Sequence, residues 1–482
     1  MAPLTSILAA LCALVVMVSA LNPIIVQEQE FIDSVTHDRF MVIGVDYQPG
    51  GQAAYGTGVG DPLSDPSACL RDAALMQNLG VNTIRCYNVA PNLNHDECAS
   101  IFNAVGIYML IDVNSPLAGQ SLNRNDPSGS YTLSYLEHIF SVVEAFKGYP
   151  NLLGFVSGNE IINDVATAQA NPPYMRAVTR DLKNYIAAQA SRQIPVGYSA
   201  ADVANVLVDT WEYLQCNNSV NNDPNSRSDF FGLNSYSWCG NGSSFTISGY
   251  NVLVEQFSNT TIPVFFSEYG CNVPSPRYFD EVPVLYGPQM TVLSGGLVYQ
   301  WTQSTANYGL VQVYSNGSAQ LLFDYDTLMA QYDKLNITLL ESSNITATSL
   351  SPPACNANLI TGGDFNNNFT IPDPPQGADA LISSGISSAP TGTLTSVTAT
   401  SVTQSVYAYN GDKISDLKIT METAANHPGA ATGLSTAGSS ATGTASSATP
   451  TSSKKSDAFR VEGGFVGSAM AAAVMGAVAF AL

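Results

Sequence analysis

Two glutamates follow short apolar runs of the chain and could act together on a glycosidic bond. Glu160 comes after the run Leu152–Ser157, and Glu268 comes after Pro263–Ser267. Glycosidic bond cleavage uses one carboxylic acid that protonates the leaving oxygen and one carboxylate on the other side of the anomeric carbon. We assign Glu160, beside the amide of Asn159, as general acid/base and Glu268 as nucleophile. A retaining mechanism of this kind predicts carboxyl groups ~5 to 5.5 Å apart.

An Asn-Glu dipeptide after an apolar run can also be the start of a helix, so the interpretation depends on what positions the two glutamates. Short strand-like runs alternate with longer helical stretches between about residues 38 and 340. This alternation predicts a parallel α/β sheet or barrel. The strand candidates are Phe40–Tyr47, Val81–Tyr87, Ile107–Val113, Leu152–Ser157, Ile194–Ser199, Phe230–Asn234, Pro263–Ser267 and Gly296–Trp301.

Eight such runs favour an α/β fold of the (β/α)8 TIM-barrel class over an open dinucleotide-binding sheet. No Gly-x-Gly-x-x-Gly follows a strand candidate, which argues further against a dinucleotide site. Two connecting helices carry clear boundary signals. Asp65 precedes Ala68–Leu79, which ends at Gly80, and Thr132–Phe146 ends near Gly148.

In such a barrel the active site lies at the carboxyl ends of the strands, so Glu160 and Glu268 share one rim. Tyrosine, asparagine and glutamine also end the strand candidates, and they offer stacking faces and hydrogen-bond partners for a sugar polymer. The formal net charge of −21 argues against nucleic-acid binding and suits a neutral substrate. Four scattered histidines and the absence of a Cys-x-x-Cys pair predict neither a metal site nor a Ser-His-Asp triad.

Both ends of the chain resemble processing signals. An apolar N-terminal run followed by small residues predicts a secretory signal peptide, and an apolar C-terminal tail after a polar stretch predicts a GPI-attachment signal. A tail-anchor helix is the alternative for the second segment. The protein is therefore expected at the outer face of the plasma membrane. The expected parts are residues 1–20 (signal peptide), 21–340 (catalytic domain), 341–382 (extension), 383–456 (disordered Ser/Thr-rich stalk) and 457–482 (GPI signal).

The cysteines and glycosylation motifs agree with secretion. Cys12 is lost with the signal peptide, and seven cysteines remain, so one thiol should be unpaired. Cys86 lies inside an apolar run and is the candidate for a buried free thiol. The other six can form three disulfides in fifteen possible connectivities. Asn-x-Ser/Thr motifs begin at Asn217, Asn241, Asn259, Asn316, Asn336, Asn344 and Asn368.

Several longer motifs resemble the fungal GPI-anchored 1,3-β-glucanosyltransferases, glycoside hydrolase family 72. They are Gly44-Val-Asp-Tyr-Gln-Pro-Gly-Gly51, Gly158-Asn-Glu160, Gly232-Leu-Asn-Ser-Tyr-Ser-Trp-Cys-Gly240, Ser267-Glu-Tyr-Gly-Cys-Asn272 and Asn307-Tyr-Gly-Leu-Val311. The resemblance runs from about residue 24 to about residue 360. It implies a retaining enzyme without a cofactor that cleaves β-1,3-glucan internally and transfers the new end to another glucan chain. The sequence after the barrel shows no Cys-rich carbohydrate-binding module, which indicates a shorter member.

The resemblance also implies roles for individual residues. It makes Glu160 the acid/base and Glu268 the nucleophile, in agreement with their strand-end positions. The implied disulfides are Cys69–Cys98, Cys216–Cys355 and Cys239–Cys271. The implied substrate contacts are Tyr87, Asn159, Asp202, Tyr236 and Tyr299, with Gln48, Asn123 and Asp126 as further candidates for the cleft.

Other interpretations stay open at this point. Asp202 could instead cap a helix that begins near Val203, and the three tyrosines could be ordinary rim or core aromatics. Leu207 stands where the family commonly has arginine, and Ser304 replaces a frequent acidic residue. The chain could therefore also be a retaining β-1,3-glucan hydrolase or a catalytically weakened glucan-binding wall protein.

Overall fold

The computed structural model describes residues 20–51, 54–55, 60–218, 224–342, 350–387, 390–430 and 434. Eight parallel strands close into a barrel in which each strand pairs with the next along the chain and β10 returns to β3. This confirms the predicted (β/α)8 fold. The barrel strands are β3 (Val42–Asp46), β4 (Thr83–Cys86), β5 (Tyr108–Asp112), β6 (Leu152–Asn159), β7 (Val196–Ala201), β8 (Phe231–Ser235), β9 (Val264–Tyr269) and β10 (Gly295–Val298).

Each barrel strand coincides with one of the predicted apolar runs to within a few residues. Parallel strands are covered by helices on the outside and by side chains inside, so both faces are buried and the strands appear as continuous apolar runs. All residues of β3, β4, β5 and β9 are buried accordingly. The runs and their polar ends were therefore a sufficient signal for the barrel.

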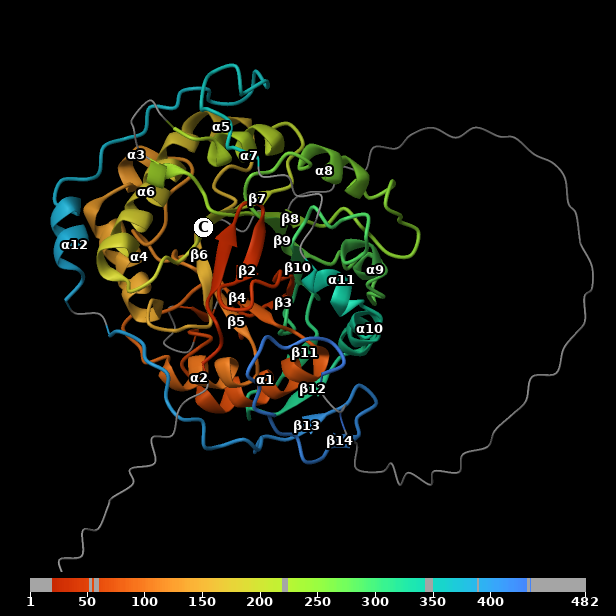
Figure 1. Ribbon diagram of the computed structural model, residues 1–482. Coiled ribbons are helices and arrows are strands. Elements are labelled where there is room, and N and C mark those ends of the chain that lie inside the picture. Colours follow the sequence, from red (N-terminus) through yellow and green to blue (C-terminus); the bar gives the residue numbers. More distant parts are fainter. Residues whose placement is uncertain are drawn as a thin grey trace, which may run out of the picture. The chain divides into compact units, whose positions relative to one another are not determined.

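Helices surround the barrel (Figure 1). Asp65 accepts hydrogen bonds from backbone N–H groups at the start of α1, and Gly80 ends this helix in a left-handed conformation, as the sequence predicted. Thr132 caps α4 in the same way. The helices are α1 (Pro66–Leu79), α2 (Asp96–Ala104), α3 (Pro127–Ser130), α4 (Leu133–Phe146), α5 (Val165–Ala170), α6 (Pro172–Gln189), α7 (Leu207–Gln215), η2 (Pro224–Ser226), α8 (Tyr250–Gln256), α9 (Val282–Leu285), α10 (Phe323–Tyr332), α11 (Ile337–Glu341) and α12 (Ala378–Ser384).

A hairpin that the sequence analysis did not identify covers the amino-terminal end of the barrel. Its strands are β1 (Ile24–Gln27) and β2 (Glu30–Asp33). Phe31 is fully buried, and its ring lies 5.9 Å from that of Phe230 and 5.8 Å from that of Phe265. The candidate site lies at the opposite end of the barrel, away from this hairpin.

Residues 383–387 and 390–430 contradict the predicted disordered stalk. This segment runs along the outside of the barrel helices (blue in Figure 1) and pairs with the hairpin of β11 (Val311–Val313) and β12 (Ala319–Leu321). Its strands β13 (Val406–Tyr407) and β14 (Lys413–Ile414) complete a four-stranded sheet. The Gln77 side chain donates to the Thr420 carbonyl at 2.7 Å and accepts from the Thr420 N–H at 2.9 Å.

For these residues the prediction was wrong because it depended on average composition; residues 388–389, 431–433 and 435–456 of the predicted stalk lie outside the described residues. A Ser/Thr-rich segment is expected to lack enough apolar surface for a core. Here a few widely spaced aliphatic side chains, Val406, Ile414 and Ile419, are buried against an existing domain, and the backbone pairs with an available strand edge. The segment therefore needs no core of its own.

The structure contains the three disulfides that the family resemblance implied, Cys69–Cys98, Cys216–Cys355 and Cys239–Cys271. Cys86 is free and buried. The second disulfide attaches the extension that follows α11 to the end of α7. The third joins the loops that follow β8 and β9, so it holds two neighbouring parts of the rim together.

The predicted signal peptide, apart from residue 20, and the predicted GPI signal at 457–482 lie outside the described residues. Within the described part of the chain, no helix has the length and apolar character needed to cross a membrane.

Candidate active site

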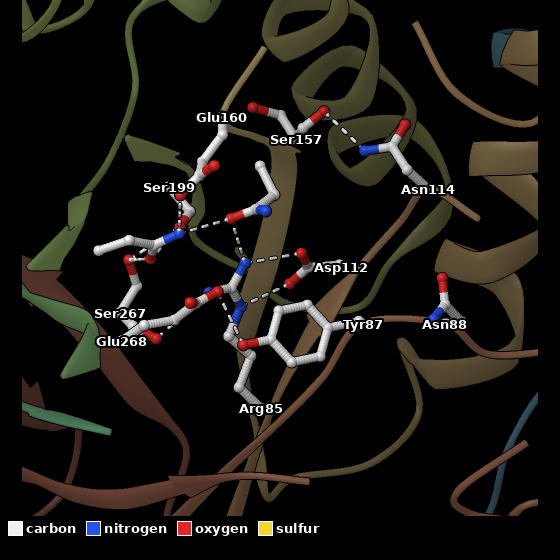
Figure 2. A network of polar contacts seen from close by, with 12 residues as sticks. Arg85, Tyr87, Asn88, Asp112, Asn114, Ser157, Glu160, Ser199, Ser267 and Glu268 are labelled. Carbon is white, nitrogen blue, oxygen red and sulfur yellow. Dashed lines mark hydrogen bonds and ion pairs between the residues drawn. The ribbon is translucent and has the colours of Figure 1, made fainter. Parts of the chain in front are cut away.

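Arg85 organises the polar residues at the carboxyl end of the barrel (Figure 2). Its side chain is fully buried at the end of β4. Nε and Nη2 donate to the two carboxylate oxygens of Asp112 at 2.9 and 2.8 Å, and Nη1 lies 3.5 Å from Oε1 of Glu268. Nη2 also donates to Oδ1 of Asn159 at 3.0 Å. One guanidinium therefore connects strands β4, β5, β6 and β9.

Glu268 lies in β9 and accepts hydrogen bonds from two tyrosines. The Tyr87 hydroxyl donates to Oε1 at 2.8 Å, and the Tyr236 hydroxyl donates to Oε2 at 2.7 Å. Burial raises the pKa of Glu268 above its usual range, Arg85 and the two hydroxyls lower it, and the charge of Glu160 raises it. The three donors stabilise the carboxylate form against this burial.

Glu160 directly follows β6 and has far fewer donors. Its backbone φ of 50° lies in the left-handed region, which is uncommon and strained for a residue other than glycine. The side chain of Asn234 donates to Oε1 of Glu160 at 2.8 Å and to Oδ1 of Asn159 at 3.1 Å. The two glutamates thus differ clearly in their surroundings, because Glu268 has an arginine and two hydroxyls and Glu160 has one amide.

The orientation of the Asn234 amide is fixed by two serines on adjacent strands. The hydroxyls of Ser199 and Ser267 donate to Asn234 Oδ1 at 3.0 and 2.8 Å. Because the oxygen is occupied in this way, the amide NH₂ group faces Glu160 and Asn159. Sequence reasoning noted Asn234 as a strand end and quoted it within a family motif, but did not assign it to the site.

Tyrosines form a continuous group beside the carboxylates. The ring of Tyr299 lies 6.4 Å from that of Tyr87, 6.2 Å from that of Tyr236 and 5.3 Å from that of Tyr308. Tyr236 and Tyr308 are 5.7 Å apart. Tyr87 and Tyr236 are therefore not merely rim aromatics, since both contact Glu268. Tyr308 was missed, although it belongs to a motif that the sequence analysis quoted.

Asp46 adds a third carboxyl group to this end of the barrel. It ends β3 and is fully buried. Burial raises the pKa of Asp46 well above its usual range, the negative charge of Glu268 adds to this effect, and Arg85 opposes it. Arg85 pairs directly with Asp112 and Glu268.

Gln48 and Asp202 lie close to the site in different ways. Gln48 is buried, and its Oε1 accepts from the backbone N–H groups of Tyr87 and Asn88, each at 3.2 Å, so it positions the strand end that carries Tyr87. Asp202 is exposed and accepts from the Ser235 hydroxyl at 2.8 Å. It does not cap a helix, because α7 begins only at Leu207.

Asn123 and Asp126 are exposed on the loop after β5, and their described side-chain hydrogen bonds stay within that loop. Asp126 caps the short helix α3 by accepting from the Gly129 N–H at 3.0 Å. The two departures from the family pattern also have clear surroundings. Leu207 is buried in the apolar core, and Ser304 accepts a hydrogen bond from the Gln300 side chain at 3.1 Å.

A closed parallel barrel with two differently supported glutamates and a group of tyrosines at its carboxyl end defines a (β/α)8 enzyme of glycosidic bonds. Comparison with known proteins agrees with this class. Residues 13–336 match the family described as Glucanosyltransferase, glycoside hydrolase family 72. The chain belongs to this family.

Individual relatives are similar over most of their length. The chain is 54% identical to the 1,3-beta-glucanosyltransferase gel2 of Aspergillus fumigatus over 424 residues, which cover 87% of this chain and 88% of that protein. It is 44% identical to the 1,3-beta-glucanosyltransferase GAS4 of Saccharomyces cerevisiae over 338 residues, covering 70% and 71%. The structure is similar to that of Saccharomyces cerevisiae Gas2p in complex with laminaritriose and laminaritetraose, with a TM-score of 0.65, 35% identity, and coverage of 75% and 78%.

Proposed function

We propose that the protein is a 1,3-β-glucanosyltransferase that cleaves β-1,3-glucan internally by a retaining double displacement and joins the new end to another glucan chain. The observation that supports this most is the asymmetry of the two carboxyl groups. Three donors support a carboxylate at Glu268, whereas Glu160 has a single amide donor. The distribution of donors suits Glu268 to act as the nucleophile and leaves Glu160 for the acid/base role.

The first displacement uses both groups at once. An oxygen of Glu268 attacks the anomeric carbon, the glycosidic bond to the leaving sugar breaks, and Glu160 gives its proton to the leaving oxygen. The fragment with the reducing end departs, and the remaining glucan is held as an ester of Glu268. Asn234 keeps the Glu160 carboxyl in place through this step, since its own orientation is fixed by Ser199 and Ser267.

The second displacement reverses these roles. A hydroxyl at the non-reducing end of an acceptor glucan attacks the anomeric carbon, and Glu160, now a carboxylate, takes its proton. The bond to Glu268 breaks, and the developing carboxylate again receives hydrogen bonds from Tyr87 and Tyr236. The electron pair thus returns to a site with donors already in position, which lowers the barrier for release.

The group formed by Tyr236, Tyr299 and Tyr308 supports transfer rather than hydrolysis. Tyrosine rings offer faces on which a second sugar can stack, and an occupied acceptor site leaves less room for water. The relatives gel2 and GAS4 are likewise 1,3-beta-glucanosyltransferases by name. The oligosaccharides in the Gas2p structure support β-1,3-glucan chains as donor and acceptor.

The cellular setting follows from the ends of the sequence. We infer that residues 1–20 direct secretion and that residues 457–482 are exchanged for a GPI lipid, so that the enzyme acts at the outer face of the plasma membrane and in the cell wall. Mass spectrometry of the membrane-released mature protein tests this inference. A C-terminal peptide that still contains residues 457–482 would contradict it.

Product sizing tests the proposed reaction. The purified protein is incubated with a reduced laminari-oligosaccharide, and we expect products longer than the donor, because only transfer can lengthen a chain. Glu160→Gln and Glu268→Gln should abolish all products, whereas the control Glu255→Gln, an exposed glutamate of α8, should leave them unchanged. Shorter products alone would indicate a hydrolase. Unchanged activity of the first two variants would contradict the assignment of both residues.

A further inference from the structure

Four aromatic side chains outside the candidate active site gather on one surface, which we call the outer aromatic patch: Tyr278, Tyr314, Phe323 and Tyr409. The three tyrosines are 50%, 45% and 52% exposed. The Phe323 ring lies 5.6 Å from the Tyr278 ring and 5.6 Å from the Tyr409 ring. Single exposed aromatics are common on protein surfaces, but a contiguous group of them marks an interaction site.

The patch combines segments that are distant in sequence. Tyr278 lies in the loop after β9, Phe323 begins α10, Tyr314 follows β11, and Tyr409 lies between β13 and β14. The C-terminal segment therefore completes the patch only because it packs on the barrel. Without residues 390–430, one of the three exposed rings would be missing.

Two glutamine side chains hold the patch in place. Gln320 accepts a hydrogen bond from the Tyr314 hydroxyl at 2.9 Å and donates to the Tyr409 carbonyl at 3.5 Å. Gln331 donates to the Tyr278 carbonyl at 2.9 Å. Tyr278 and Tyr409 are thus fixed through their backbones, and the exposed parts of their rings, which also pack against Phe323, can contact a ligand.

A single arginine connects the patch to the active site. Arg277 precedes Tyr278, and it donates to the carbonyls of Tyr299 and Tyr308, each at 2.6 Å. It also forms an ion pair of 2.6 Å with Asp324, the neighbour of Phe323. The tyrosines of the site and the aromatics of the patch therefore belong to one rigid framework.

We propose that the outer aromatic patch is a second binding site for β-1,3-glucan, separate from the catalytic cleft. This inference rests on the proposed function, because it takes the substrate to be a neutral sugar polymer. Aromatic faces with nearby amides are suited to sugar rings and hydroxyl groups. The charged groups at its edge, Asp280, Lys334 and Asp412, carry hydrogen bonds to neighbouring amides and give the surface no single strong charge.

A second site on the same framework matters only for long chains. A glucan that occupies both sites binds the second one intramolecularly, so its overall affinity rises, whereas a short oligosaccharide in the cleft gains nothing. We therefore expect the patch to raise the preference for long or particulate glucan by about tenfold, a modest gain beside the ~100- to 10,000-fold that linked sites can reach.

The test uses the full chain with Asn316→Gln, which removes a predicted glycan from the turn beside Tyr314. In this background Tyr278→Ala plus Tyr409→Ala is compared with Val252→Ala, an exposed apolar control on α8. Binding to insoluble β-1,3-glucan particles is measured in proteins that also carry Glu160→Gln, so that no turnover interferes. Thermal unfolding verifies that each variant is folded.

We expect the double substitution to weaken binding to the particles about tenfold. In the same variants with Glu160 intact, it should lower the ratio of kcat/KM for long over short glucan by a similar factor. Val252→Ala should change neither quantity. Unchanged particle binding in the double variant would overturn the proposal. Loss of binding to glucan-free wall protein, with particle binding retained, would also overturn it and indicate a protein partner instead. If the protein with Glu160 intact does not lengthen oligosaccharides, the proposed function is refuted. Particle binding by the double variant then still decides whether the patch binds glucan.

Discussion

Tyr236→Phe isolates the contribution of one hydroxyl to the charge of Glu268. The Tyr236 hydroxyl donates to Glu268 at 2.7 Å, and phenylalanine keeps the ring but removes this donor. A hydrogen bond to a charged group contributes about 1.5 to 3 kcal/mol. One pKa unit corresponds to about 1.4 kcal/mol, so the pKa of Glu268 should rise by about one to two units while Arg85 and Tyr87 still hold the carboxylate.

The sign of the effect on activity follows from the mechanism. Glu268 must be ionised to attack, so kcat/KM falls as the pH drops through the pKa that governs its charge in the free enzyme. A higher pKa moves this acid limb of the profile to higher pH. The second displacement should also slow, because the departing carboxylate has lost a donor. Together these effects predict a loss of activity that is largest at acid pH.

The assay is the pH profile of kcat/KM for oligosaccharide transfer in the parent and the variant. Tyr332→Phe is the matched control, because it removes the hydroxyl of a buried tyrosine that contacts Tyr269 and not Glu268. We expect the acid limb to move by about one to two units in Tyr236→Phe and to stay in place in Tyr332→Phe. An unmoved limb, or the same shift in both variants, would refute the reasoning.

Three further predictions concern stability. Arg85→Met should lower the free energy of unfolding by about 3 to 5 kcal/mol, because it leaves buried carboxylates without a counter-charge; urea titration measures this, and a loss below about 1 kcal/mol would contradict it. Asp46→Asn should remove a decline in stability with rising pH. The folded state raises the pKa of Asp46 above the unfolded value of about 3.9, so the parent loses stability as the pH rises above that value; melting temperatures from acid to neutral pH test this, and parallel curves would speak against it. A chain ending at residue 387 should unfold at a lower temperature than one ending at residue 437. The shorter chain loses about 1.5 to 3 kcal/mol of stability for each aliphatic side chain of residues 390–430 that is buried against the barrel. Equal melting temperatures would show that this segment does not stabilise the barrel.

The barrel could be predicted from sequence because each strand is a local signal. A run such as Val264–Tyr269 is apolar along its length and ends in Glu268, and both features can be seen without knowing any partner strand. The same holds for helix ends such as Asp65 and Gly80, where capping depends on neighbouring residues alone. The two candidate catalytic glutamates followed from these local signals and one general rule about barrel rims.

The support around those glutamates could not be predicted in the same way. Arg85 contacts Glu268 across the barrel, 183 positions away, and only closure of the sheet brings the two together. Asn234 is one of many asparagines, and its importance depends on two serine donors from adjacent strands. The packed C-terminal segment gave no compositional signal, because its stability comes from a strand edge on β12.

The most direct test of the central claim identifies the residue that carries the glycosyl group. Glu160→Gln is incubated with a laminari-oligosaccharide bearing a highly activated leaving group, which needs no acid to depart, so the first displacement proceeds and the second is slowed. Peptide mass spectrometry of the trapped protein should find the sugar on Glu268, and Glu268→Gln should carry none. A glycosyl group on another residue, or product formation with inverted anomeric configuration and no covalent adduct, would contradict the double displacement through Glu268.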